Sequence, residues 1–256
     1  MKILLTSGGT KIPVDRVRDI TNMSNGTFGS RIAHVALESG GRVFFLHAKH
    51  SCTPFSCTFD FANGFFKNLA EFLRMSIFGL KHHRRYESAE FRNFDDYEIG
   101  LQKAIKEFRP DVIILAAAVS DYGVKNYIDG KLRTSEDQSI DLYPLEKIIG
   151  KVKGWAPYAA LVGFKLLIED DDAVVEAAKT SILNNGCSIV VANTLQSLES
   201  GNHTLHIVER PSMVTTGMVR CMSSDFSVST YRKHAHPNDR YYLARMVMRA
   251  VKRIYR

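Results

Sequence analysis

The feature that most constrains the fold is the alternation of short apolar runs with segments of helical periodicity. Residues 2–6 and 42–48 are short apolar runs that predict strands, and residues 27–39 between them place apolar side chains near one helical face. Residues 111–119 contain a longer apolar run, which is typical of a central parallel strand covered on both faces. Strand, helix and strand in this order predict an α/β fold.

The same alternation continues towards the end of the chain. Further elements are predicted at residues 97–108 (helix), 160–164 (strand), 171–183 (helix), 189–192 (strand), 203–209 (strand) and 240–255 (helix). Strands separated by helices favour a mostly parallel sheet with right-handed crossovers. We therefore predict a doubly wound, Rossmann-like sheet with helices on both faces, and a single domain over residues 1–256.

One segment does not fit this alternation. Residues 49–95 are rich in phenylalanine, contain an Asn63-Gly64 turn, and have a helical pattern at residues 67–76. Linkers are poor in aromatic residues, so this segment is predicted to be an insertion with its own apolar face. Its role stays open between a substrate lid, a dimer surface and a cover for the sheet edge.

Composition narrows the class of protein. No apolar run reaches the roughly 18 residues that a membrane-spanning helix needs. Four cysteines without metal-ligand spacing predict free thiols and a cytoplasmic protein. The net charge of +7 suits nucleic acid or anionic small substrates. Because the basic cluster at residues 81–85 has no regular aromatic spacing, we do not expect nucleic-acid binding.

Ligands of such sheets bind beyond the carboxyl ends of the strands, where glycine-rich and polar segments fall in this chain. In the turn Ser7-Gly8-Gly9-Thr10 the glycines let the backbone approach a phosphate, but by themselves they equally suit a turn with only a structural role. Asn22, Ser24 and Gly26 precede the helix at 27–39, whose N-terminus could bind an anion or be an ordinary capped end. Gly29 favours anion binding, because it removes a side chain where a phosphate would approach.

A second polar segment follows the strand at 111–119. Three alanines, residues 116–118, leave room for a ligand against the backbone, and Asp121 stands at the mouth of the predicted site. Asp121 also suits a simple turn or cap, and Lys131, ten residues further on, also suits a surface position. The residues alone leave both alternatives open.

Together these segments resemble the phosphopantothenoylcysteine synthetase (phosphopantothenate–cysteine ligase) family in its standalone form. Four later blocks match in the family's order, at residues 116–122, 130–135, 162–166 and 190–193. The first block matches at Thr6, Gly8, Gly9, Thr10, Pro13, Val14, Asp15, Val17, Arg18, Ile20, Thr21, Asn22, Ser24, Gly26 and Gly29. Asn25 departs from the usual Ser or Thr, and the helix at 171–183 keeps one basic residue, Lys179, where the bacterial type often has two.

The resemblance implies a ligase of coenzyme A biosynthesis. Its substrates would be 4'-phosphopantothenate, cysteine and a nucleoside triphosphate, with ATP favoured over CTP. Mg²⁺ would enter on the phosphates, with no protein metal ligands expected. The resemblance also implies a homodimer in the cytoplasm, with no membrane or nucleic-acid partner.

The resemblance also implies roles for particular residues. Lys131 would stabilise charge on the α-phosphate, Asn22 would hold the acyl carbonyl, and Arg18 would position the Asn22 loop. Ala117 and Ala118, with Asn22, would contact the substrate. Nucleotide contacts are expected from Gly8, Gly9, Thr10, Ser24, Gly26, Gly29, Asp121, Phe164, Lys165, Lys179 and Asn193.

The alternative is an NAD(P)-binding Rossmann-type oxidoreductase. That class needs a GxGxxG turn after the first strand and an acidic residue about 20 positions later. The glycine spacing at residues 7–10 does not match this fingerprint. We therefore expect the ligase and not the oxidoreductase.

Overall fold

The computed structural model of the protein falls into two compact units. Unit 1 comprises Met1–Arg109 and Ala116–Ile148, and unit 2 comprises Pro110–Leu115 and Ile149–Arg256. The structure describes residues 1–56, 64–133, 137–201, 203–210, 213–216, 219–222, 226–233, 236 and 239–255, with backbone only for 213–216 and 219–222.

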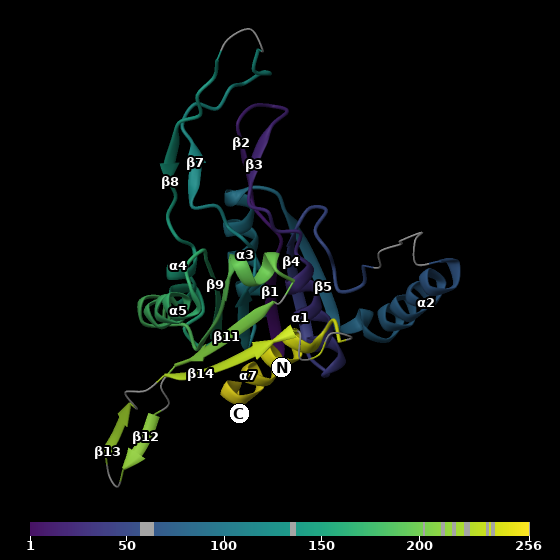
Figure 1. Ribbon diagram of the computed structural model, residues 1–256, viewed down its shortest axis with the longest axis vertical. Helices are drawn as coiled ribbons and strands as arrows, with labels where there is room; N and C mark the ends of the chain where they lie inside the picture. The colour runs from purple at the N-terminus through teal and green to yellow at the C-terminus, as the bar shows by residue number, and fades with distance from the viewer. Residues whose placement is uncertain are drawn as a thin grey trace. The chain divides into compact units, whose positions relative to one another are not determined.

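Unit 1 is built on three parallel strands in the order β1-β4-β5 (Figure 1). The strands are β1 (Lys2–Ser7), β4 (Arg42–Ala48) and β5 (Tyr86–Phe91), and the helices that pack on them are α1 (Thr27–Glu38) and α3 (Phe94–Phe108). Leu5 faces α1, whereas Phe44 of the neighbouring strand packs its ring against Phe108 of α3. Because Leu4 pairs with Phe44, Leu5 and Phe44 point to opposite faces, so the two helices cover opposite faces.

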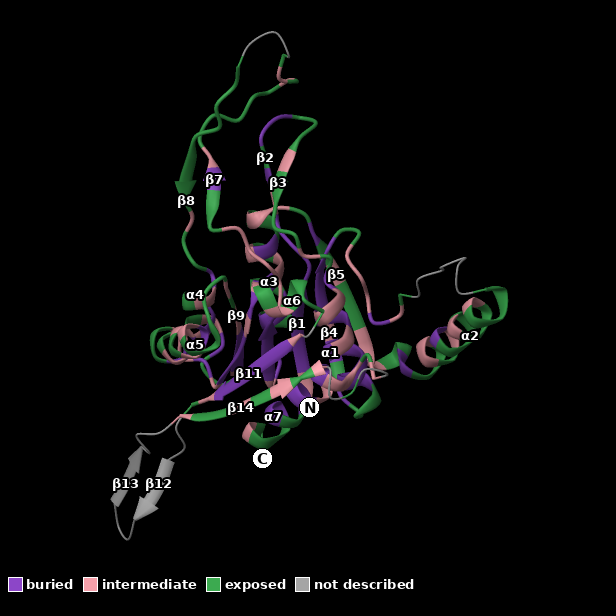
Figure 2. Cartoon of the chain, viewed as in Figure 1, coloured by how far each residue is buried: buried purple, intermediate pink, exposed green. Residues whose placement is uncertain are grey.

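The segment predicted as an insertion contains a long helix and a strand of the sheet. The helix α2 (Phe65–His82) extends beyond the predicted 67–76 and is followed by a 3₁₀ turn, η2 (His83–Arg85). Figure 2 shows most of α2 exposed. Phe65 and Phe66 are among its exposed side chains. The strand β5 was not predicted, because it is an edge strand whose sequence, YESAEF, is largely polar. The predicted turn at Asn63 lies outside the described residues, apart from Gly64.

Two small antiparallel hairpin-like pairs extend from unit 1 and were not predicted. The pairs are β2 (Lys11–Pro13) with β3 (Asp19–Thr21), and β7 (Tyr122–Val124) with β8 (Leu142–Pro144). A parallel bridge between Asp15 and Ile128 connects the two pairs. Strands of three residues are too short to carry a readable hydrophobic period.

Unit 2 contains five strands in the order β14-β11-β10-β9-β6, of which β10, β9 and β6 are parallel. The strands are β6 (Val112–Leu115), β9 (Ala160–Leu167), β10 (Ile189–Thr194), β11 (Thr204–Glu209) and β14 (Ser227–Arg232). The helices are α4 (Ile149–Trp155), α5 (Asp171–Asn185), α6 (Leu195–Glu199) and α7 (Tyr242–Tyr255). A further antiparallel pair joins β12 (Met213–Thr216) to β13 (Val219–Met222).

Helices cover both faces of the unit 2 strands as well. On β11, His206 lies 3.2 Å from Asp171 of α5, whereas Glu209 pairs with Arg253 of α7. Residues 206 and 209 have opposite parity on the strand and therefore point to opposite faces. The predicted fold class is thus confirmed: each unit has parallel strands with helices on both faces. In the described part of the chain no helix combines the length and apolar character needed to cross a membrane.

Candidate functional site

The glycine turn after β1 packs against the N-terminus of α1. Gly8 and Gly26 have φ angles of 88° and 76°, in the left-handed region that favours glycine. The Ser7 hydroxyl donates a hydrogen bond of 3.0 Å to the carbonyl oxygen of Gly26. A Cβ atom on Gly29 would lie 2.3 Å from Ser7 Oγ, so the close packing of Ser7 already requires glycine there. The sequence interpretation of Gly29, room for a phosphate, therefore has a competing structural reason.

The segment after β6 runs alongside this turn and meets it at Ala118. The Ala118 amide donates to the Gly8 carbonyl at 2.8 Å, and the Thr10 amide donates to the Ala118 carbonyl at 3.2 Å. The Asn22 side-chain amide donates to the same carbonyl at 3.0 Å. Thr10 Oγ1 accepts from the Ser120 amide at 2.9 Å, so this predicted nucleotide contact has a structural role in the fold. The predicted segments 7–26 and 116–122 are therefore in direct contact.

Asp15 is a buried carboxylate that connects a third predicted segment to the first. Its two oxygens accept from the backbone amides of Val17 (2.7 Å), Arg18 (2.6 Å) and Leu132 (3.0 Å), and from the Arg18 guanidinium at 2.6 Å. The Leu132 amide is the largest influence that holds the Asp15 pKa far below its usual value, against the opposing effect of burial. Only 2% of Asp15 is exposed, so these donors replace its water.

Sequence reasoning placed Asp15 in the matched block but gave it no role. The available signal was a carboxylate followed two and three residues later by amides that can turn back onto it, as in an Asx turn. The partner Leu132 could not be read from the sequence, because it lies 117 positions further along the chain. Arg18 was predicted to position its loop, and its ion pair with Asp15 is consistent with that role.

Lys131 lies between two backbone anchors on this loop. The Arg16 amide donates to the Gly130 carbonyl at 3.0 Å, and the Leu132 amide donates to Asp15. The Lys131 side chain itself is exposed. The following block residues Thr134 and Ser135 lie outside the described residues. The loop that carries Asn22 and the segment that carries Lys131 are thus held together by one main-chain hydrogen bond and by the Asp15 carboxylate.

Asp121 and Ser24 occupy less constrained positions in unit 1. Asp121 is exposed, and its carboxylate lies 3.5 Å from the Lys147 ammonium. The Ser24 amide donates to the Asn22 carbonyl at 2.8 Å. In the part of the chain that the structure describes, no hydrogen bond or ion pair directly joins any two of Asn22, Asp121 and Lys131. The structure therefore brings together the segments that carry them, through contacts of neighbouring residues.

The remaining predicted residues belong to unit 2. Phe164 and Lys165 lie on β9 and pair in register with Val191 and Ala192 of β10, and Asn193 is near the carboxyl end of β10. β9 runs three residues past the predicted end at 164, so Phe164 and Lys165 lie inside this strand, whereas Asn193 is the penultimate residue of β10. Lys179 lies on α5, where its ammonium is 2.6 Å from the Glu176 carboxylate.

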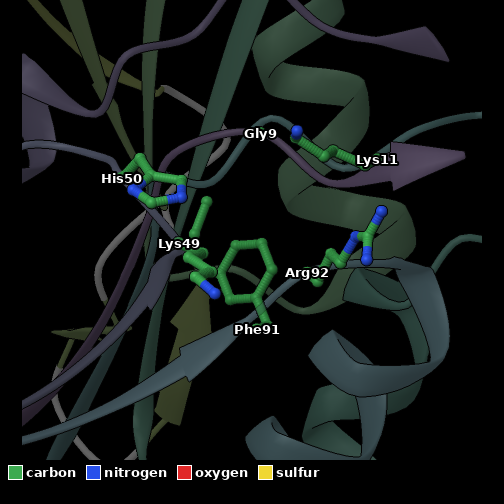
Figure 3. A pocket seen from close by; sticks show the side chains of 7 residues that line it. Gly9, Lys11, Lys49, His50, Phe91 and Arg92 are labelled. Atoms are coloured by element: carbon green, nitrogen blue, oxygen red, sulfur yellow. The ribbon is translucent and has the colours of Figure 1, made fainter. Parts of the chain in front are cut away.

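Unit 1 also contains a cationic pocket that sequence reasoning missed. Its cavity volume is about 250 Å³, and it is lined by Gly9, Lys11, Ala48, Lys49, His50, Phe91 and Arg92 (Figure 3). Only Gly9 was predicted as a site residue. The Lys49-His50 pair after the strand at 42–48 was a usable signal. Arg92 was not recognised as a residue at a strand end, because the preceding strand, β5, was not predicted. Among the described residues no cluster of His, Cys, Asp and Glu side chains could hold a metal ion.

Comparison with known proteins identifies the family. The sequence profile of the DNA/pantothenate metabolism flavoprotein C-terminal domain matches residues 1–59 and 97–218. The phosphopantothenate–cysteine ligase of Homo sapiens is 31% identical over 235 residues, which cover 77% of this chain and 73% of that protein. The bifunctional coenzyme A biosynthesis protein CoaBC of Thermococcus kodakarensis is 30% identical over 210 residues, or 82% of this chain. The chain spans 45% of that CoaBC protein and 65% of the Saccharomyces cerevisiae ligase CAB2.

Solved structures share the fold. The DNA/pantothenate metabolism flavoprotein of Streptococcus pneumoniae has a TM-score of 0.72 at 24% identity, with 99% of each chain covered. A Cab2 mutant in complex with phosphopantothenate-cysteine has a TM-score of 0.67 at 25% identity, with 81% of this chain and 76% of that chain covered. The resemblance seen in the sequence blocks is thereby confirmed. This chain belongs to the family of the DNA/pantothenate metabolism flavoprotein C-terminal domain and is a relative of the phosphopantothenate–cysteine ligases.

Proposed function

We propose that this protein joins 4'-phosphopantothenate to cysteine in coenzyme A biosynthesis, at the expense of a nucleoside triphosphate. The observation that carries the proposal is the docking of the Lys131 segment onto the Asn22 loop through the buried Asp15 carboxylate. Homologous ligases that act on these substrates support it, and a nicotinamide-dependent oxidoreductase is not favoured.

The proposed reaction has two steps. A carboxylate oxygen of phosphopantothenate attacks the α-phosphorus of the nucleotide, the bond to the β-phosphate oxygen breaks, and pyrophosphate leaves. The cysteine amine then attacks the acyl carbon, loses a proton to solvent, and displaces the nucleoside monophosphate. All reacting groups of the first step are anionic, so the site must offset their mutual repulsion. Mg²⁺ held by the nucleotide phosphates would supply part of that charge.

The chain's own residues would bind and orient these groups. Lys131 would stabilise charge on the α-phosphate, and its exposed ammonium is free to reach a ligand while its backbone is fixed. Asn22 would hold the acyl carbonyl, and the bond from its amide to Ala118 would keep it oriented. Arg18 would keep the loop in place through Asp15. Nucleotide contacts are proposed from Gly8, Gly9, Thr10, Ser24, Gly26, Gly29, Asp121, Phe164, Lys165, Lys179 and Asn193, and substrate contacts from Ala117 and Ala118.

The proposal extends to the nucleotide, the oligomeric state and the compartment. ATP is favoured over CTP, because α5 carries one basic residue and that residue, Lys179, is paired with Glu176. A homodimer is supported by apolar side chains exposed on and beside β3, where Ile20 and Met23 are 40% and 99% exposed. Free thiols at Cys52 and Cys187 suit the reducing cytoplasm.

The test is pyrophosphate release with 4'-phosphopantothenate and cysteine, compared between ATP and CTP. We expect release that depends on both substrates and a higher kcat/KM with ATP. No release with either nucleotide would refute the proposed function. A higher kcat/KM with CTP would refute only the nucleotide preference.

Lys131→Gln tests the central residue. Removing one preorganised charge partner should lower kcat at least about 10²-fold with unchanged thermal stability. Lys125→Gln is a matched control, since Lys125 is also an exposed lysine of unit 1 and has no proposed role. Near-normal turnover of the Lys131→Gln variant would remove Lys131 from the mechanism.

A further inference from the structure

The cationic pocket of unit 1 lies at the carboxyl ends of three parallel strands. Gly9 follows β1, residues 48–50 end and follow β4, and residues 91–92 end and follow β5. Main-chain hydrogen bonds fix the walls: the Lys11 amide donates to the Arg92 carbonyl at 2.9 Å, and the Lys49 amide donates to the Phe91 carbonyl at 3.0 Å. The pocket is therefore part of the folded framework of unit 1.

Positive charge dominates this pocket. Lys11, Lys49 and Arg92 line it, and no lining residue is acidic. The Asp19 carboxylate lies 3.4 Å from both the Lys11 ammonium and the Arg92 guanidinium, and the Asp96 carboxylate accepts the Arg92 amide at 3.2 Å. Three lining cations against these two carboxylates leave one positive charge in excess. In the part of the chain that the structure describes, Lys49 has no ion pair. The pocket thus presents an excess of positive charge to a ligand.

His50 adds a second indication. Its φ angle is 67°, and it is one of only two non-glycine residues with positive φ among those described. Both sides of it are held, since the Lys49 amide bonds to Phe91 and the Ser51 amide bonds to the Ala48 carbonyl at 3.0 Å. Such backbone strain persists where surrounding structure enforces it, and it concentrates at ligand sites. Figure 3 shows the imidazole at the edge of the pocket, across the Phe91 ring from Arg92.

We propose that this pocket is an anion subsite for a phosphate group. Lysine and arginine side chains with little competing acid are the usual partners of phosphate, and the planar guanidinium can bind it bidentately. The volume of about 250 Å³ is far above the roughly 10–15 Å³ that a cavity needs to hold one water molecule, which admits a phosphate and part of an attached chain.

The subsite adjoins the Asn22 loop through Gly9. A Cβ atom on Gly9 would lie 3.0 Å from the Asn22 carbonyl oxygen and 3.3 Å from Thr21 Oγ1. Gly9 therefore lines the pocket and also packs closely against the Asn22 loop. This inference rests on the proposed function for the identity of the phosphate. Two sources fit: the phosphate of 4'-phosphopantothenate, with its chain directed to Asn22, and the pyrophosphate released in the first step.

The experiment measures binding by isothermal titration calorimetry without turnover. The probes are 4'-phosphopantothenate, pantothenate and pyrophosphate, each titrated into the whole protein and its Lys49→Gln variant. Losing one charge-assisted contact should weaken binding of the phosphate probe about 10–100-fold and leave pantothenate binding unchanged. Lys49 is exposed and has no ion pair among the described residues, so Lys49→Gln should keep the wild-type unfolding temperature.

The matched control is Lys103→Gln, an exposed lysine on α3 outside the pocket, which should bind every probe as the wild type does. Weakened binding of 4'-phosphopantothenate would assign the substrate phosphate to the pocket, and weakened binding of pyrophosphate alone would assign the product. Unchanged binding of both in Lys49→Gln and Arg92→Gln would overturn the subsite. If the wild type released no pyrophosphate in the ligase assay, the function would fail while the pyrophosphate titration still tested the pocket.

Discussion

Replacing Gly29 with alanine should destabilise unit 1, because the new methyl group has no space. Its Cβ would lie 2.3 Å from Ser7 Oγ and 2.8 Å from Ser7 Cβ. Overpacking of this kind costs about 1–3 kcal/mol. Displacing Ser7 would also break its hydrogen bond to Gly26, worth about 1 kcal/mol, and the better helix propensity of alanine offsets a similar amount. The expected net loss is therefore about 1–3 kcal/mol.

The assay is thermal and urea unfolding of the whole protein. At about 2–4 °C per kcal/mol, the Gly29→Ala variant should unfold about 2–12 °C below the wild type. Gly79→Ala is the matched control, since Gly79 is also helical and a Cβ there would be 3.7 Å from Phe55, an ordinary contact. That control should be as stable as the wild type or up to about 1 kcal/mol more stable. Adding Ser7→Gly to the Gly29→Ala variant should relieve the clash and recover part of the loss.

The result that would refute this reasoning is a Gly29→Ala variant as stable as the wild type. If such a variant also had a raised KM for the nucleotide, the reason for glycine at this position would be room for a phosphate. The sequence interpretation would then be correct, and Ser7 would be able to move aside for a methyl group at position 29.

Two further predictions concern buried ionisable groups. Asp15→Asn should lower the free energy of unfolding at pH 7. Because the pKa of the folded carboxyl is below its unfolded value of about 3.9, the stability advantage of the wild type should shrink as the pH falls below about 4. Urea midpoints of both proteins at pH 7 and below about pH 4 measure this difference, and a difference that grows in acid would contradict the prediction. Burial raises the pKa of the Cys187 thiol to about 11, so iodoacetamide at pH 8 should label half-buried Cys52 well before Cys187, as read by peptide mass spectrometry. Equal labelling rates would show that Cys187 is accessible.

Much of the sheet could be predicted from the sequence because its central strands are continuous apolar runs. Residues 42–48 form a strand with the predicted bounds, and the helix predicted at 27–39 ends one residue earlier than expected. The strand at 86–91 could not be recognised, since an edge strand with polar side chains has no apolar run. The short pairs at 11–21 and 122–144 depend on contacts between distant segments, which local periodicity does not report.

The candidate site was predictable in its segments and not in its connections. The polar and glycine-rich stretches were found because strand ends in a parallel sheet are where ligands bind. The role of Asp15, whose carboxylate joins two of these segments, was not predicted. That role depends on the hydrogen bond from the Leu132 amide and on burial of the carboxylate, and the sequence reports neither. The four hydrogen-bond donors of this buried carboxylate come from two distant segments, so no single stretch of the sequence indicates them.

Glycine illustrates why a motif match leaves the physical cause undecided. Gly29 and Gly130 both belong to blocks that resemble the family, although only Gly29 was assigned a ligand contact from the sequence. In the structure a Cβ on Gly29 would collide with Ser7, whereas a Cβ on Gly130 would have no atom within 4 Å. Packing therefore suffices to explain glycine at position 29 but not at position 130. The structure thus separates a glycine that close packing requires from one at which it shows no steric need for glycine.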